Sequence, residues 1–180
     1  MALAFPGGPA RTSQEVLAGS RILVVDDEPA NVRLLTQLLT KAGYQVTGTN
    51  DPRQVVDLVS TGNPDLLILD LHMPHLDGFE VMQSLGPVLS PVRYLPILIL
   101  TADTSSVVKQ RALGMGARDF LGKPFDRVET LLRIRNLLTT RHLYTTLEQE
   151  QHRLEAAVRE RTRELADAHL EIVDRLARAA

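Results

Sequence analysis

Three short aliphatic runs and two less apolar strand-like segments alternate along the chain with longer stretches whose apolar residues recur every three or four positions. A run of about four aliphatic residues between turn residues predicts a strand buried on both faces, whereas the longer spacing predicts an amphipathic helix. This alternation predicts an α/β domain with a parallel sheet. The expected strands are residues 21–25, 45–49, 66–70, 97–100 and 119–121, and the expected helices are 31–42, 52–60, 78–85 and 105–113.

Residues that start and stop helices support these boundaries. Gly43 follows the first helix as a C-terminal stop. Asp51 and Pro52 give the second helix an N-cap and a proline at its first position. We expect Thr104 to cap the helix at 105–113, which ends in a glycine-rich turn.

The chain changes character after Pro124. Every glycine and proline lies within residues 1–124, and from Asp126 onward arginines and acidic residues balance one another. Asp126, with Glu129 three positions later, has the pattern of a capping box. The segment therefore predicts one helix of roughly 50 residues, on the order of 80 Å long at 1.5 Å per residue.

A seven-residue spacing within this last helix favours a two-stranded coiled coil. The alternative is an exposed helix with an incidental apolar stripe. Two arginines and a threonine among the seam positions weaken the pattern. One series of seam positions is Leu137, Tyr144, Gln151, Val158, Leu165 and Ile172, and the other is Thr140, Leu147, Leu154, Arg161, Ala168 and Arg175.

Composition limits the function classes to be considered. The 180 residues are 44% hydrophobic with a net charge of −2, and no run of 18 apolar residues suggests a membrane span. The absence of cysteine excludes disulfides and thiolate metal sites and suits the cytoplasm. Without a basic face, nucleic-acid binding is not expected. We expect a flexible leader at 1–20, a folded domain at 21–140 and a helical linker at 141–180.

Polar side chains stand at the ends of the predicted strands. Asp26 and Asp27 follow the first strand, Asp70 ends the third, Thr101 follows the fourth, and Lys123 follows the fifth. Because parallel strands point the same way, these groups are expected to meet at one edge of the sheet, where open α/β sheets bind ligands.

Three carboxylates at one edge require either that one of them is protonated or that a cation binds. Each pair of like charges about 5 Å apart costs roughly 1–4 kcal/mol, depending on the local dielectric. Oxygen ligands on an open rim suit Mg²⁺, and a carboxylate beside Mg²⁺ can act as a nucleophile toward phosphorus. A nearby hydroxyl and an ammonium group complete the parts that phosphoryl transfer needs.

Residues 21–140 resemble the receiver domain of two-component response regulators. The resemblance implies a flavodoxin-like, doubly wound five-stranded parallel sheet of order 2-1-3-4-5, here followed by the long C-terminal helix. The individual motifs are short, but their order and spacing together are specific. They are Val25-Asp-Asp-Glu-Pro29, Leu69-Asp-Leu-His-Met-Pro74 with Asp77-Gly78, Thr101-Ala102, and Lys123-Pro-Phe125.

The resemblance implies a role for each residue of the site. Asp70 becomes the phosphoacceptor, and Asp26, Asp27 and Asp70 with the backbone carbonyl of His72 become the Mg²⁺ ligands. Thr101 and Phe120 form the switch pair, with phenylalanine where tyrosine often stands. Lys123 binds the phosphoryl group, and the Lys123–Pro124 bond is expected to be cis.

The resemblance also implies partners. A sensor histidine kinase would donate the phosphoryl group, and the chain itself would be no enzyme beyond self-catalysed phosphoryl transfer and dephosphorylation. Arg159-Glu-Arg-Thr-Arg-Glu164 is similar to linkers that join receivers to outputs, including histidine kinases. Residues 170–180 are similar to the stretch before HD-GYP cyclic di-GMP phosphodiesterase domains, so we expect an output domain of that kind outside these residues. The heptad spacing of the last helix makes us expect a homodimer.

Two other classes of function remain open. A pseudo-receiver would act as a dimerisation or adaptor module without phosphorylation, but the acidic cluster, Thr101 and Lys123 would then have no role. A phosphatase of the haloacid dehalogenase type would form an aspartyl phosphate. That class needs a second aspartate two residues after the nucleophile, and His72 at this position argues against it.

Overall fold

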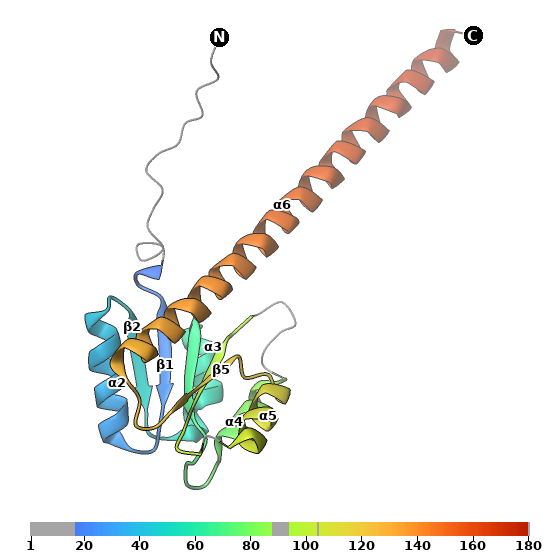
Figure 1. Cartoon of the computed structure of the whole chain (residues 1–180). Coiled ribbons are helices and arrows are strands. Elements are labelled where there is room, and N and C mark those ends of the chain that lie inside the picture. The colour runs from blue at the N-terminus through green and yellow to red at the C-terminus, as the bar shows by residue number, and fades with distance from the viewer. Residues whose placement is uncertain (1–16, 88–93, 104, 180) are drawn as a thin grey trace, which may run out of the picture. The chain divides into compact units, whose positions relative to one another are not determined.

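The computed structural model describes residues 17–87, 94–103 and 105–179. The strands and helices alternate as the hydrophobic pattern predicts (Figure 1). The elements are β1 (Arg21–Val25), α2 (Pro29–Lys41), β2 (Gln45–Thr49), the 3₁₀-helix η1 (Pro52–Gln54), α3 (Val55–Gly62), β3 (Leu66–Asp70), α4 (Gly78–Leu85), β4 (Ile97–Thr101), α5 (Ser106–Gly114), β5 (Asp119–Gly122) and α6 (Arg127–Ala179).

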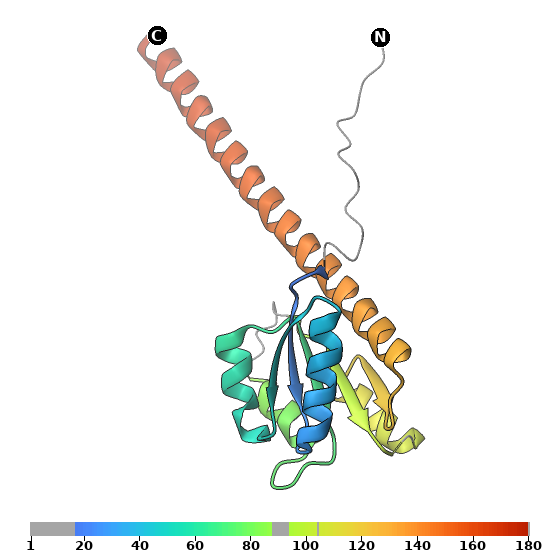
Figure 2. The same cartoon turned by 90° about the vertical axis from the view of Figure 1, so that its left-hand side faces the viewer.

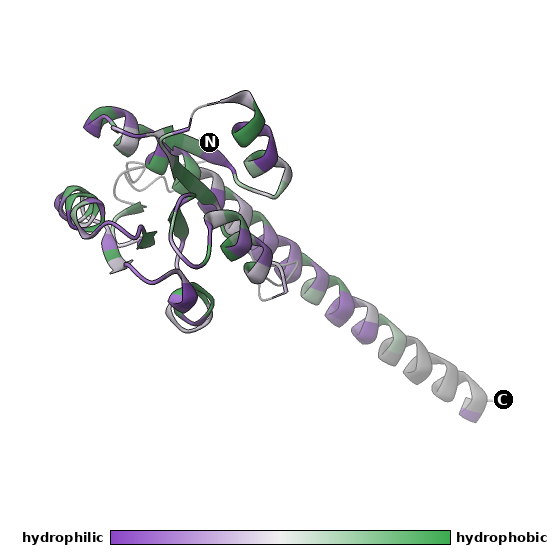
Figure 3. Cartoon of the chain, turned by 90° about the horizontal axis from the view of Figure 1, so that it is seen from below, coloured by the Kyte–Doolittle hydropathy of each residue, from purple (hydrophilic) through white to green (hydrophobic). Residues whose placement is uncertain are grey.

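The described strands form one parallel sheet in the order β2-β1-β3-β4-β5. This is the predicted flavodoxin-like order, so the fold prediction is confirmed. Every residue of β3 and β4 is buried, which explains their unbroken aliphatic runs. Figure 3 shows the strands largely in the green of hydrophobic residues.

Helices cover both faces of the sheet (Figure 2). On one face, side chains of α2 and of the first turns of α6 pack on β1, β3 and β4, with Leu35 and Ile134 fully buried. On the other face, α3, α4 and α5 pack on the same strands through residues such as Val59 and Leu85. Leu17 is buried with the first group, so the described packing begins before β1.

Several helix boundaries differ from the predicted ones. Helix α2 begins at Pro29 rather than residue 31, because proline suits the first helical position. Asp51 caps η1, and α3 continues to Gly62, where Asn63 adopts a left-handed conformation with φ 46°. Ser105 is the N-cap residue of α5; Thr104, which was expected to be the cap, lies outside the described residues.

Helix α4 starts with a capping box that the sequence analysis missed. The Asp77 carboxylate accepts from the Glu80 backbone N–H and the Glu80 carboxylate from the Asp77 N–H, each at 2.8 Å. A Cβ on Gly78 would lie 2.4 Å from the Asp70 carbonyl oxygen. Only glycine therefore allows the start of α4 to approach the end of β3 this closely.

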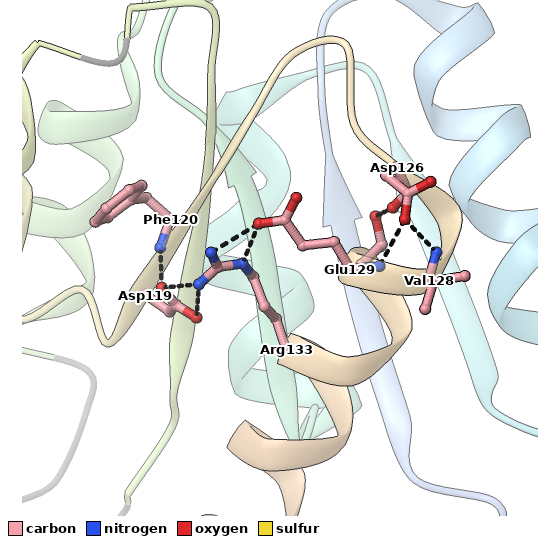
Figure 4. Close-up of polar contacts among 7 residues, drawn as sticks. Asp119, Phe120, Asp126, Val128, Glu129 and Arg133 are labelled. Carbon is pink, nitrogen blue, oxygen red and sulfur yellow. Dashed lines mark hydrogen bonds and ion pairs between the residues drawn. The ribbon is translucent and has the colours of Figure 1, made fainter.

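Helix α6 confirms the predicted long helix with 53 residues. Asp126 accepts from the backbone N–H groups of Val128 and Glu129 at 2.8 and 2.9 Å. The Glu129 carboxylate binds Arg133, one turn later, instead of closing the predicted capping box (Figure 4). The charged guanidinium of Arg133 makes stronger hydrogen bonds to the Glu129 carboxylate than a single neutral backbone N–H would.

The chain divides into two units, Met1–His142 and Leu143–Ala180. Leu137, which the heptad pattern placed at a seam, is buried in the core of the first unit. In the second unit, Leu147, Leu154 and Leu165 are exposed, at 70%, 64% and 71%. Among the described residues, no helix is both long and apolar enough to span a membrane.

Candidate functional site

Three carboxylates meet where β1 and β3 end. Ligand oxygens of Asp26, Asp27 and Asp70 all lie within 4.8 Å of one another. Asp26 and Asp70 are buried, at 0% and 3% exposed, whereas Asp27 reaches solvent. The parallel strands thus bring together the three residues that the sequence analysis selected, and they leave one side of the cluster open.

The Lys123 ammonium group lies between two of these carboxylates. Its Nζ is 2.8 Å from Asp26 Oδ2 and 2.9 Å from Asp70 Oδ2. The backbone N–H of Lys123 donates to the Thr101 carbonyl at 2.8 Å, which fixes the end of β5 beside β4. The Lys123–Pro124 peptide bond is cis. Three carboxylates and one ammonium leave a local charge of −2.

Burial and charge act in opposite directions on the two central groups. Burial raises the pKa of Asp70 above its usual value; the ion pair with Lys123 opposes this shift, and the charge of Asp26 adds to it. Burial alone would lower the pKa of Lys123, but its hydrogen bonds to Asp26 and Asp70 outweigh burial and raise it. Lys123 therefore stays charged, while the negative charge on Asp70 is costly without a second cation.

Two asparagines that the sequence analysis missed hold Asp26 in place. The Asn31 side chain donates to Asp26 Oδ1 and Oδ2 at 3.1 and 3.0 Å, and the Glu28 N–H donates to Oδ1 at 2.9 Å. The Asn50 side chain donates to the Asp26 carbonyl at 2.7 Å. Asn50 follows β2 just as Asp26 follows β1, so the strand-end rule could have found it.

The Thr101 hydroxyl is buried and bound to its own loop. It donates to the Asp103 carbonyl at 3.1 Å and accepts from the Asp103 N–H at 3.0 Å. Thr101 therefore stands at the predicted edge, but its hydroxyl caps the turn after β4. Its predicted contact with a phosphoryl group requires these bonds to be exchanged.

Phe120, the other residue of the predicted switch pair, is held from α5 and α6. Its half-buried ring lies 4.3 Å from the Lys109 ammonium. Its N–H donates to Asp119 at 2.8 Å, and Arg133 binds both oxygens of that carboxylate at 2.8 Å (Figure 4). Sequence reasoning missed this link between β5 and α6, because Asp119 and Arg133 are 14 positions apart on two different elements.

The two histidines of the loop after β3 are not among the groups of the carboxylate cluster. His72 and His75 are exposed, and His75 has φ 72°. The backbone of His72 lowers the pKa of the Asp70 carboxyl, against the larger effect of burial. Within the part of the chain that the structure describes, the cluster that could hold a metal ion is the three aspartates.

Comparison with known proteins identifies the family of this chain. The family model of the response regulator receiver domain matches residues 22–135. Response regulator MprA of Mycolicibacterium vanbaalenii is 44% identical over 118 residues, 66% of this chain and 50% of that protein. This chain therefore spans about half the length of the curated relatives it matches.

Solved structures resemble the first unit. The chemotaxis protein CheY4 of Vibrio cholerae has a TM-score of 0.62 and 31% identity, with coverage of 67% of this chain and 99% of that chain. The signal receiver domain of an HD domain-containing protein from Pseudomonas fluorescens has a TM-score of 0.62 and 28% identity, with coverage of 69% and 98%.

Proposed function

This chain belongs to the response regulator receiver family, and from that premise we propose that it accepts a phosphoryl group on Asp70 from a sensor histidine kinase. One observation carries the proposal. The Lys123 ammonium bridges Asp26 and Asp70 while Asp27 leaves the cluster open, so a nucleophile, a fixed cation and room for a second cation share one site.

The carboxylate cluster fits Mg²⁺. Its donors are hard oxygen atoms, and the local charge of −2 that remains after Lys123 is counted matches a divalent ion. Asp26, Asp27 and Asp70 would hold the ion together with the backbone carbonyl of His72. When bound, Mg²⁺ neutralises charge that develops on the phosphoryl oxygens.

The residues of the chain carry out the rest of the reaction. A carboxylate oxygen of Asp70 attacks phosphorus, and the bond between phosphorus and the donor nitrogen breaks as the imidazole leaves. Lys123 already contacts the Asp70 carboxylate and would move its ammonium onto a phosphoryl oxygen. Asn31 and the Glu28 N–H keep Asp26 oriented during this exchange.

The switch follows from the same charge. A phosphoryl group near −2 on Asp70 offers the Thr101 hydroxyl a stronger acceptor than the Asp103 carbonyl. Thr101 would turn toward the phosphoryl group and vacate space beside β4 for the Phe120 ring. The ring would then lose its contact with Lys109.

The second unit is proposed to form a parallel homodimer. Leu147, Leu154, Val158 and Leu165 recur at heptad spacing and are 64–71% exposed. Burying one aliphatic side chain is worth about 1.5–3 kcal/mol, so four from each helix supply about 12–24 kcal/mol. The cost of association is about 4–15 kcal/mol.

A coil of this kind would bring two output domains together in the cytoplasm. We propose an HD-GYP-type cyclic di-GMP phosphodiesterase as that output, because the sequence of residues 170–180 resembles the stretch before such domains and an HD domain-containing protein carries a similar receiver. Residues 159–164 resemble linkers to several kinds of output domain, so a different output such as a histidine kinase is one alternative. A pseudo-receiver is the alternative without phosphorylation.

Intact-mass spectrometry after incubation with acetyl phosphate tests the proposed function. The wild type with Mg²⁺ should gain one phosphoryl group, whereas Asp70→Asn should gain none and EDTA should prevent the gain. Asp57→Asn is the matched control, because Asp57 is an exposed carboxylate on α3 outside the site. Phosphorylation of Asp70→Asn, or an effect of Asp57→Asn equal to that of Asp70→Asn, would refute the assignment of Asp70 as the acceptor. A wild type that gains no phosphoryl group would favour the pseudo-receiver.

A further inference from the structure

A second polar cluster lies at the opposite edge of the sheet, where β3 begins. Asp65 directly precedes β3, and its Oδ2 accepts from the Arg21 backbone N–H at 2.9 Å. Its Oδ1 lies 3.2 Å from Arg141 Nε and 3.1 Å from Arg141 Nη2. An aspartate at the entry of the central strand is thus bound by an arginine of α6 that is 76 positions away in sequence.

Arg141 also binds the segment that enters β4. Its Nη1 donates to the Tyr94 carbonyl oxygen. Pro96, two residues later, accepts from the Leu67 N–H of β3 at 3.1 Å. One guanidinium therefore joins the entries of two neighbouring strands, and we call Asp65, the Tyr94 carbonyl and Arg141 the Arg141 clamp.

The strands joined by the clamp are those that carry the phosphoryl chemistry. Strand β3 ends at Asp70 and β4 ends at Thr101, and the two strands pair along their length. Arg141 is also the next-to-last residue of the first unit, which ends at His142. The clamp therefore joins the segments that enter both strands of the site to the last turn of α6 within that unit.

We propose that Arg141 is a positioning residue that couples the phosphorylation state of Asp70 to the helix beyond residue 142. This inference rests on the proposed function. Phosphorylation draws the Thr101 end of β4 toward Asp70, and β4 then shifts relative to β3. That shift changes the hydrogen bonds of Arg141 to Asp65 and to the Tyr94 carbonyl, and therefore how firmly α6 is attached at Arg141.

The chemistry of the contacts suits this role. A guanidinium presents its donors in a fixed plane, so it cannot follow independent shifts of a carboxylate and a carbonyl without losing a bond. The Arg141 side chain is 15% exposed and that of Asp65 is 24% exposed, so solvent screens this pair less than a surface ion pair.

The apolar contacts of α6 would respond differently. Leu137 and Leu138 are buried against the sheet one turn earlier. Their contacts have no directional requirement, so they tolerate a small slide. The hydrogen bonds of Arg141 therefore determine how far along α6 the helix stays attached to the rest of the first unit.

Amide hydrogen exchange of residues 139–150, with and without beryllofluoride and Mg²⁺, tests the proposal. In the wild type, the phosphoryl mimic should change exchange in this stretch on the order of fivefold. In Arg141→Gln this change should disappear, although intact-mass spectrometry should still show phosphorylation by acetyl phosphate. Because coupling between two sites is reciprocal, the affinity of Arg141→Gln for beryllofluoride should differ from that of the wild type by a similar factor.

Two further variants separate coupling from a purely structural role. Arg153→Gln removes the same charge from an exposed position of the same helix and should leave the response intact. Arg141→Lys keeps the charge and loses the planar fork, so it should fold and still lose the response, even if Arg141→Gln fails to fold.

Three outcomes would overturn the proposal. The first is an unchanged response in Arg141→Lys, and the second is a wild type that is phosphorylated without any response in residues 139–150. The third is a wild type that is not phosphorylated at all. This last result is recognised from the mass measurement alone and would refute the proposed function as well.

Discussion

The two parts of α6 have similar apolar spacing but different surroundings. Within the first unit, Ile134, Leu137 and Leu138 are at most 9% exposed because they pack on the sheet. Within the second unit, Leu147, Leu154 and Leu165 are 64–71% exposed. The comparison shows that periodicity predicts an apolar face but does not identify what covers it. Only the first face has its partner within the described residues of this chain.

The largest expected effect on stability comes from truncating a buried leucine of α6. Leu138→Ala should lower the free energy of unfolding by about 2–5 kcal/mol, because it leaves a cavity in the core. Leu154→Ala should change the stability of the first unit by less than about 0.5 kcal/mol. Urea unfolding at low protein concentration, followed by circular dichroism, measures both. Equal losses in the two variants would contradict the contrast between the two faces.

Shortening the chain separates the two parts directly. A chain that ends after His142 keeps the whole first unit, including Arg141, and should be a monomer that still accepts a phosphoryl group. The 180-residue chain should have the mass of a dimer in light scattering at micromolar concentrations. Leu154→Ala should weaken that dimer, whereas Arg153→Ala, on the outer face of the predicted coil, should leave it intact. A monomeric full-length chain would show that the exposed face has another partner.

A smaller effect is expected at the phosphorylation site of the metal-free protein. Burial raises the pKa of Asp70 in the folded protein, so the uncharged carboxyl favours folding, and this contribution is fully present below the ordinary pKa of 3.8. It is lost as the pH rises through the raised pKa, because the buried carboxyl then becomes charged. Asp70→Asn should therefore stabilise the protein at pH 7 in EDTA, on the order of 1 kcal/mol. The difference should shrink toward pH 4. Thermal unfolding at both pH values checks the sign, and a destabilised Asp70→Asn at pH 7 would contradict it.

The smallest contrast concerns ion pairs on the two parts of α6. Arg133 is half-buried and binds both oxygens of Asp119, whereas Arg159 is exposed and lies 4.0 Å from Glu155. Arg133→Gln should cost about 0.5–1 kcal/mol and Arg159→Gln less than about 0.5 kcal/mol. Urea unfolding of the two variants, in low and high salt, provides the test. A larger cost for Arg159→Gln would indicate that Arg159 has a structural partner.

The sequence was sufficient for the sheet and for the convergence of the site. Buried parallel strands need continuous aliphatic runs, and parallel order forces their polar ends to one edge. The second rule applies to Asp26, Asp70 and Lys123. In the structure, the Lys123 ammonium lies within hydrogen-bonding distance of both carboxylates. The roles of these residues in phosphoryl transfer stay predictions that the proposed experiments address.

Contacts that depend on competing partners could not be predicted. Glu129 could cap its own helix or bind Arg133, and the charged partner prevails. The Thr101 hydroxyl could face the site or its own loop, and the loop conformation decides. Arg141 and Asp65 meet only because the fold brings an internal turn of α6 to the start of the central strand, so no local pattern marks the pair.

Locating the phosphoryl group within the chain tests the central claim most directly. Borohydride reduction of an aspartyl phosphate changes the mass of that residue, and peptide mapping then identifies its position. After incubation with acetyl phosphate and Mg²⁺, the change should appear at Asp70 and should be absent when EDTA is present. A change at Asp26 or Asp27, or one at Asp70 that does not depend on Mg²⁺, would contradict the account.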